Sequence, residues 1–244
     1  MGMPVTVEVV DAAATASTLD LVYDYFQYID NKFSTYKVNS EISQINQGLL
    51  TLKRSSADMQ TVFGLSEQTR RETDGYFNIE HNGYYDPSGL VKGWAIYHAA
   101  EILRQQGFRN FYVDAGGDVQ LAGTNERGEV WRIGIRNPFN INQIVKVLSL
   151  TDLGIATSGS YIRGDHIYNP LGNHEKVSDI VSLTVIGPNI YEADRFATAA
   201  FAMGREGINF ISQLDGFEGY MIDELGQATY TAGFDRYTIH DKVH

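Results

Sequence analysis

The stretch GIATSGSYIRGDHIYNPLG, residues 154–172, combines a strand-like start with hydroxyls, glycines and one histidine. Thr157, Ser158 and Ser160 supply three aliphatic hydroxyls, and four glycines free the backbone. Small residues with accessible N–H groups suit a surface that approaches phosphate or another backbone closely. The simpler alternative is a Gly/Ser loop between two strands that carries a surface histidine. The rest of the sequence must therefore decide whether this stretch is a functional site or a plain loop.

Outward from this stretch, the predicted helices and strands come in blocks rather than in strict alternation. This pattern predicts the α+β class, with helices packed on a mainly antiparallel sheet. Helices are predicted over residues 15–33, 40–46, 57–73, 92–106, 191–203 and 206–214. Strands are predicted over residues 5–10, 111–114, 119–121, 131–135, 145–150, 154–156, 180–186, 219–222 and 228–231.

Composition limits the classes of partner. The 244 residues allow one large domain or two small ones, and the net charge is −11. A surface this acidic argues against nucleic acid or an anionic membrane as the main partner. An anionic ligand would need a metal ion, a helix N-terminus or a few placed cations to offset that charge. The absence of cysteine excludes disulfides, thiolate metal sites and cysteine nucleophiles.

No apolar run approaches the length that spans a membrane, and the first residues run directly into a strand pattern. We therefore expect a cytoplasmic protein with no signal peptide, no lipid-modified cysteine and no transmembrane segment. A chain trimmed at its N-terminus would look the same and could come from an exported or membrane-anchored protein.

An aromatic loop precedes a predicted helix at residues 76–89, and Lys92 follows at the helix start. A Gly-containing loop that opens a helix can present N–H groups and the positive dipole end to an anion. The structural alternative is a tyrosine-rich turn packed on the core.

Asp194 and Thr198 lie four residues apart on a predicted helix and so share one face. A carboxylate and a hydroxyl together could bind a hard cation with oxygen ligands. Alternatively, the Thr198 hydroxyl bonds the backbone of its own helix and Asp194 stabilises the helix N-terminus. Taken alone, these two residues favour this structural alternative over a cation site.

Taken together, these segments resemble the ApbE family, the FAD:protein FMN transferases, over nearly the whole chain and in the family's order. The resemblance rests on several short motifs rather than on one. They are MetGly at 1–2, PheSerThrTyr at 33–36, SerGlu at 40–41 with Asn46, AspGlyTyrPheAsn at 74–78, AspProSerGlyLeuValLysGly at 86–93, AspAlaGlyGlyAsp at 114–118, Trp131 with Pro138, AlaThrSerGlySerTyr at 156–161, HisIleTyrAsnPro at 166–170 and AlaAspArgPheAlaThr at 193–198.

The resemblance implies a single T-fold-like domain over residues 1–244 that transfers FMN from FAD to a Thr or Ser hydroxyl of a target flavoprotein and releases AMP. It implies His166 as the catalytic residue. Magnesium, with calcium or manganese as alternatives, would be held by Gly89, Asp194 and Thr198. The implied FAD-binding residues are Met1, Tyr36, Tyr76, Phe77, Asn78, Asp86 and Lys92.

The FMN transfer that the resemblance implies agrees with the types of residue in these motifs. Phosphoryl transfer needs positioned reactants and neutralised charge, and a histidine of near-neutral pKa can accept a proton from the attacking hydroxyl. Two other functions remain open from the sequence: a pyrophosphatase that splits FAD into FMN and AMP with water, and a flavin-binding protein without catalysis.

The chain departs from the family pattern at several points. The loop between Asn78 and Asp86 is short and lacks a Gly-Pro-Leu-Val segment, and Leu171-Gly172 shortens a later turn. Asn169 stands where the family usually has Asp, which predicts weaker charge support behind His166. Arg195 beside Asp194 could compete for the carboxylate, although adjacent helix positions point apart.

Overall fold

The computed structural model describes residues 2–159, 167–172 and 175–239. Met1 and His166, two of the predicted site residues, lie outside these described residues.

A seven-stranded sheet forms the middle layer, and its strand pairings are antiparallel throughout the described residues. The strand order is β1-β4-β5-β8-β11-β12-β13, so β8, which starts the stretch at residues 154–172, is the central strand. The strand bounds are β1 Val5–Val9, β4 Phe111–Ala115, β5 Asp118–Ala122, β8 Gly154–Gly159, β11 Ile180–Gly187, β12 Glu218–Asp223 and β13 Ala228–Tyr230.

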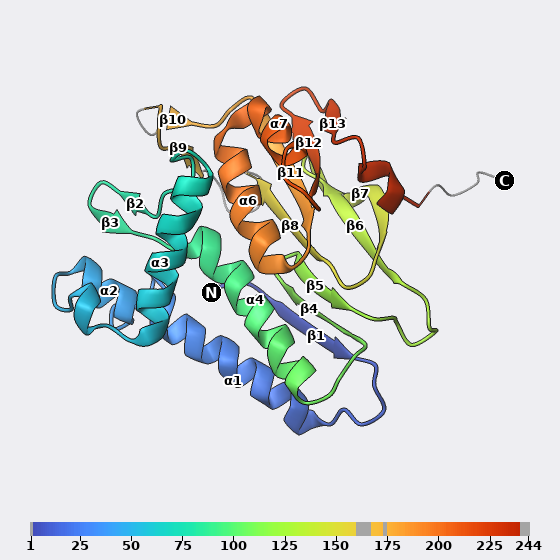
Figure 1. The fold of residues 1–244 in the computed structure, drawn as a ribbon, viewed down its shortest axis with the longest axis horizontal. Coiled ribbons are helices and arrows are strands. Elements are labelled where there is room, and N and C mark those ends of the chain that lie inside the picture. The colour runs from blue at the N-terminus through green and yellow to red at the C-terminus, as the bar shows by residue number, and fades with distance from the viewer. Residues whose placement is uncertain (1, 160–166, 173–174, 240–244) are drawn as a thin grey trace.

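Helices cover one face of this sheet, where α4 (Ser88–Gln105) and α6 (Ile190–Ala202) lie side by side (Figure 1). Inward-facing side chains of these helices and the sheet form the main core, which includes Leu90, Ile96, Phe111, Leu183 and Phe201. The other helices are α1 Ala16–Phe33, α2 Glu41–Asn46, α3 Ala57–Glu72 and α7 Gly207–Ser212, with 3-10 turns at Leu52–Arg54, Gly204–Glu206 and Phe234–Tyr237.

The opposite face of the sheet is covered by a long hairpin of β6 (Trp131–Asn137) and β7 (Asn140–Leu150). Its inward residues form a second core cluster with Leu121, Ile155 and Phe234. Neighbouring residues of one strand, such as Ile155 and Ala156, belong to different clusters because successive side chains point to opposite faces. The sheet is therefore buried on both sides.

The structure confirms the α+β class and the antiparallel sheet. Several predicted boundaries were wrong: α4 starts at Ser88 rather than at residue 92, β7 starts at Asn140 rather than at residue 145, and β8 ends at Gly159 rather than at residue 156. The predicted loop at residues 76–89 contains a small hairpin, β2 (Glu80–His81) and β3 (Tyr84–Tyr85). Asn82 and Gly83 join its strands with φ of 52° and 76°, the left-handed geometry that two-residue hairpin turns require.

No helix among the described residues is both long and apolar enough to cross a membrane.

Candidate functional site

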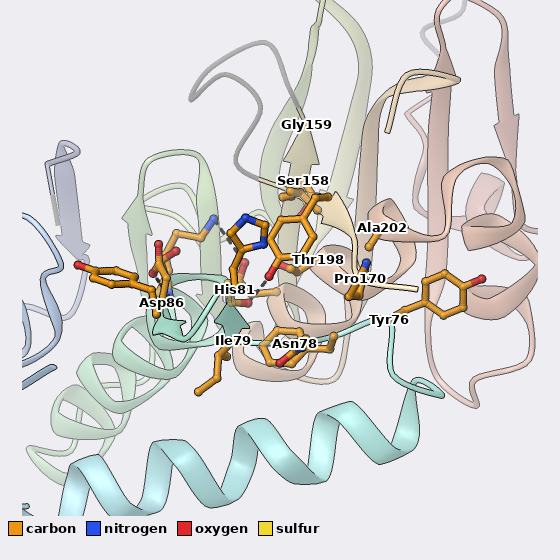
Figure 2. Close-up of a pocket in the computed structure, with 18 of the residues that line it drawn as sticks. Tyr76, Asn78, Ile79, His81, Asp86, Ser158, Gly159, Pro170, Thr198 and Ala202 are labelled. Atoms are coloured by element: carbon orange, nitrogen blue, oxygen red, sulfur yellow. Dashed lines mark hydrogen bonds and ion pairs between the residues drawn. The ribbon is translucent and has the colours of Figure 1, made fainter. Parts of the chain in front are cut away.

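A cavity of about 550 Å³ lies where the helical layer meets the end of β8. Its walls come from the loop at residues 76–79, the β2–β3 hairpin, the first turns of α4, the end of β8 and helix α6. Figure 2 shows Asp86 toward one end, Tyr76 toward the other, and Ser158 and Gly159 at the end of the central strand β8. Segments far apart in the sequence therefore meet around one space.

Three charged groups that are largely shielded from solvent meet behind one wall of the cavity, which Lys92 and Asp194 line. The Lys92 ammonium forms an ion pair with Asp118 and lies 3.3 Å from Oδ1 of Asp194. The other Asp194 oxygen, Oδ2, accepts a hydrogen bond of 2.7 Å from the backbone N–H of Gly93. Both carboxylates are about 2% exposed. Two carboxylates and one ammonium leave an excess negative charge in a dry environment, which favours binding a proton or a cation.

The pKa of Asp194 reflects chiefly its burial beside these charges. Burial raises the pKa of its carboxyl to about 7; the Lys92 ammonium and the Gly93 N–H oppose the rise, and the Asp118 carboxylate adds to it. The pKa of Asp114, at the end of β4, is also raised, chiefly by burial. A cation that replaced the proton on Asp194 would relieve the same imbalance.

Thr198 lies one turn after Asp194 on α6, and its hydroxyl donates a 3.1 Å hydrogen bond to the carbonyl oxygen of Gly89 on α4. The sequence-level alternative, in which Thr198 bonds its own helix and Asp194 stabilises its own helix N-terminus, is wrong, because both side chains reach across to α4. A hydroxyl, a backbone carbonyl and a carboxylate offer oxygen donors alone, the set that hard cations such as magnesium and calcium accept. Within the described residues, no three His, Asp or Glu side chains gather as a metal cluster.

Glycines of α4 allow α6 to approach this closely. A Cβ on Gly93 would lie 2.5 Å from Cβ of Asp194 and 2.7 Å from the carbonyl oxygen of Ile190. A Cβ on Gly89 would lie 2.9 Å from Cγ2 of Thr198. All three contacts are shorter than van der Waals distances, so the close approach of α4 and α6 requires glycine at both positions.

A second cavity of about 450 Å³ adjoins the first. Tyr36, 93% exposed, lies on its wall, together with Met3 and Phe33. Asp86, Ser88 and Lys92 line both cavities, so the N-terminus of α4 lies between them.

Nine of the residues that the sequence predicted for the site line these two cavities. Tyr76, Phe77, Asn78, Asp86, Gly89, Lys92, Asp194 and Thr198 line the first cavity, and Tyr36 lines the second. Lys92 lies one turn inside α4 rather than at its start. Phe77 is only 2% exposed, so it supports the wall more than it presents an open ring. Gly159 and Ile167, on the two sides of the segment that contains His166, both line the first cavity.

Sequence reasoning missed two contributions to the site, those of Asp118 and His81. Asp118 closes the Asp-Ala-Gly-Gly-Asp motif but was not predicted as a site residue, and its Oδ1 also accepts the N–H of Thr157 at 3.0 Å. His81, on the β2–β3 hairpin, lines the cavity and lies 4.3 Å, ring to ring, from Tyr168 of β9 (Tyr168–Asn169). Both reach the site through contacts between residues distant in sequence, which only the tertiary structure shows.

Two departures from the family pattern have structural explanations. Oδ1 of Asn169 accepts the N–H groups of Leu171 and Gly172, so this side chain closes its own turn. Arg195 does not compete for Asp194, since it pairs with Glu72 and Glu192 instead.

The fold is that of the solved ApbE structures. The flavin transferase ApbE from Vibrio cholerae superposes with a TM-score of 0.83 at 23% identity, covering 97% of this chain and 96% of that one. The ApbE protein from Thermotoga maritima gives 0.83 at 20% identity, covering 98% and 97%. These likenesses establish the fold.

The ApbE family model matches residues 1–84 and 80–221, and the chain belongs to the ApbE family. Curated relatives include the FAD:protein FMN transferases of V. cholerae, 35% identical over 133 residues, and of Escherichia coli K12, 31% identical over 157 residues. These alignments cover 50% and 61% of this chain, and 40% and 45% of the relatives. The chain thus spans less than half the length of these two relatives.

Proposed function

We propose that this protein transfers the FMN part of FAD to a Thr or Ser hydroxyl of a target flavoprotein and releases AMP. The observation that supports this most directly is the wall of Lys92, Asp194 and Thr198 beside two adjoining cavities. The names of the curated relatives supply the activity.

The two cavities suit a molecule with two ring systems joined by a diphosphate. Asp86, Ser88 and Lys92 line both cavities, so a diphosphate that crossed between them would pass the N-terminus of α4 and the Lys92 ammonium. Helix N-termini bind phosphate through free N–H groups and the helix dipole. We propose one ring system beside Tyr76 and Asn78 and the other beside Tyr36, with Met1 also contacting FAD.

The proposed step forms one bond and breaks one. The acceptor oxygen attacks the phosphorus of the FMN phosphate, the bond from that phosphorus to the bridging oxygen breaks, and AMP leaves with that oxygen. The proton of the acceptor hydroxyl goes to a base, which we propose to be His166. Lys92 holds positive charge near the diphosphate.

We further propose that Asp194, Thr198 and the Gly89 carbonyl hold magnesium. The all-oxygen donors and the excess buried negative charge fit such an ion, and calcium or manganese would use the same donors. When bound, the ion would neutralise charge on the transferred phosphate.

The central test incubates the protein with FAD, magnesium and a candidate flavoprotein, followed by mass spectrometry of the flavoprotein. A covalent FMN adduct with equimolar AMP is expected. FMN and AMP formed equally well without the acceptor would indicate the pyrophosphatase instead. FAD binding without AMP would indicate a non-catalytic flavin-binding protein.

The metal proposal is tested with EDTA and with Asp194→Asn, whose amide oxygen can still accept the Gly93 N–H. Transfer should be lost in both while the far-UV spectrum is unchanged. Full activity after metal removal would overturn the magnesium assignment.

The base is tested by comparing two histidine variants. His166→Ala should retain FAD binding and lose transfer by about 10²–10⁴-fold, the usual contribution of a positioned base. His81→Ala is the matched variant, because His81 is a histidine that lines the first cavity. A parental rate for His166→Ala together with a large loss for His81→Ala would assign the proton transfer to His81.

A further inference from the structure

Arg195 is a buried cation next to a proposed metal ligand, yet it points away from the cavity. Its side chain is 6% exposed and forms ion pairs with Glu72 at the end of α3 and with Glu192 on its own helix. It also donates a 3.2 Å hydrogen bond to the hydroxyl of Thr69 on α3. The guanidinium carbon lies 4.0 Å from the ring centroid of Phe196. These contacts fix one guanidinium between two helices.

The last turn of α3, which Arg195 contacts, controls the loop that follows. The Thr73 hydroxyl donates to the carbonyl of Thr69 at 2.8 Å and accepts the backbone N–H of Phe77 at 3.1 Å. Asp74 and Gly75 have φ of 50° and 90°, so the chain reverses directly after the helix. Thr73 is fully buried, and its bond therefore sets where the loop at residues 76–78 begins.

The same loop returns to the helix that carries Arg195. Phe77 is 2% exposed and packs beside Gly89, where an added Cβ would lie 3.6 Å from its ring. The carbonyl of Gly89 accepts the hydroxyl of Thr198, which lies three residues after Arg195 on α6. A closed ring of contacts thus runs from α6 through α3, the loop and α4 back to α6. Arg195 joins the α6 and α3 parts of that ring.

The ion pair between Arg195 and Glu72 can hold α6 against α3 at neutral pH. Burial would raise the pKa of Glu72, but hydrogen bonds from Gln68 and Arg195 outweigh burial and lower that pKa. The pair is therefore charged at neutral pH. A planar guanidinium that donates to two helices also fixes orientation, which a lysine ammonium would not.

We infer that Arg195 is a positioning residue that holds the cavity loop at residues 76–78 against the proposed metal-binding face of α6. The expected effect of Arg195 on FAD binding rests on the proposed function. Its structural part, the link from Arg195 to the Phe77 amide, is independent of any ligand.

The first experiment measures hydrogen exchange of the intact protein without ligand. Arg195→Met should speed exchange in residues 73–79 by about tenfold or more, while exchange in β12 stays at the parental rate. Equal exchange in residues 73–79 of both proteins would overturn the inference, whether or not the protein binds FAD.

Two glutamates provide a matched comparison, because both accept from Arg195 and only Glu72 lies on α3. Glu72→Ala should weaken FAD binding by about tenfold in a fluorescence titration, and Glu192→Ala should leave it near parental. Equal losses of FAD affinity in the two variants would contradict the inference, because they would show that Arg195 needs only a neutralising charge and not the link to α3. A parent that fails to bind FAD would count against the proposed function instead.

A double-mutant cycle tests whether Arg195 acts through Thr73. Thr73→Val removes the acceptor of the Phe77 N–H while keeping the shape of the side chain. Each single variant should weaken FAD binding by about tenfold, and Arg195→Met with Thr73→Val should weaken it little further. A combined loss of about one hundredfold would show independent effects and contradict the proposed path.

Discussion

The ammonium of Lys92 lies between two buried carboxylates from different elements, in an ion pair with Asp118 of β5 and 3.3 Å from Oδ1 of Asp194 of α6. Lys92 itself belongs to α4. One cation therefore ties the two core helices to the central sheet at the wall of the cavity.

This relationship predicts that Lys92→Met destabilises the protein by about 3–5 kcal/mol, because removing one partner of a buried pair leaves uncompensated charge. Adding Asp118→Asn to Lys92→Met should restore part of the loss. Urea unfolding measures both. Lys37→Met is the control: Lys37 pairs with Asp30 with 46% of its side chain exposed, so its loss should cost at most about 1 kcal/mol. Similar costs for the two lysines would contradict the prediction.

Gly93→Ala should destabilise the fold by about 1–3 kcal/mol, the usual cost of overpacking. The new methyl group would meet the backbone carbonyl of Ile190 at 2.7 Å, and a backbone atom cannot swing away. Gly64→Ala on α3 is the matched control, since nothing lies within 4 Å of its added Cβ. That variant should gain about 0.5–1 kcal/mol from helix propensity. Thermal unfolding of the two proteins should therefore shift in opposite directions.

Asn46→Ala should loosen the β2–β3 hairpin. The Asn46 amide donates to the carbonyl of Tyr85 at 2.9 Å and accepts its N–H at 2.8 Å, as a neighbouring strand would. Losing both bonds should cost about 1–3 kcal/mol and speed amide exchange in residues 80–85. Asn46→Asp keeps the acceptor and should show a smaller effect. Unchanged exchange in Asn46→Ala would mean that other contacts hold the hairpin.

His98 should make stability depend on pH. Burial lowers its pKa in the folded state, although Asp58 and Glu101 oppose the shift, and Trp94 packs 4.7 Å away. Below the ordinary histidine pKa of about 6.5, the unfolded chain binds this proton more readily, so stability should fall as pH drops from 7.5 to 5.5. At pH 7.5 the His98 contribution to this slope should be nearly absent.

The variant His98→Phe keeps an aromatic ring and removes the titration. Its urea midpoint should change less between pH 7.5 and 5.5 than that of the parent. An identical change in the two proteins would assign the pH dependence to other groups.

Much of the fold was predictable because its signals are local. Apolar spacing predicted α1 and α6 to within about a residue, and α2 begins directly after its N-cap Ser40, within the predicted range 40–46. The start of α4 was misplaced because Pro87 and Ser88 resemble loop residues, although proline is common at helix starts. The β2–β3 hairpin was missed because its strands have only two residues each, too few to show an alternating pattern.

By itself, the sequence determined the α+β class, the family resemblance and eight of the residues that line the first cavity, since motifs and periodicity are properties of neighbouring positions. Only the tertiary structure decided what Asp194, Thr198 and Arg195 contact. Asp194 and Thr198 reach across to α4 because glycines there let the helices approach, and Arg195 turns to α3 because Glu72 meets it there. Such contacts join residues distant in sequence, and their geometry follows from the packing of whole elements rather than from any local pattern.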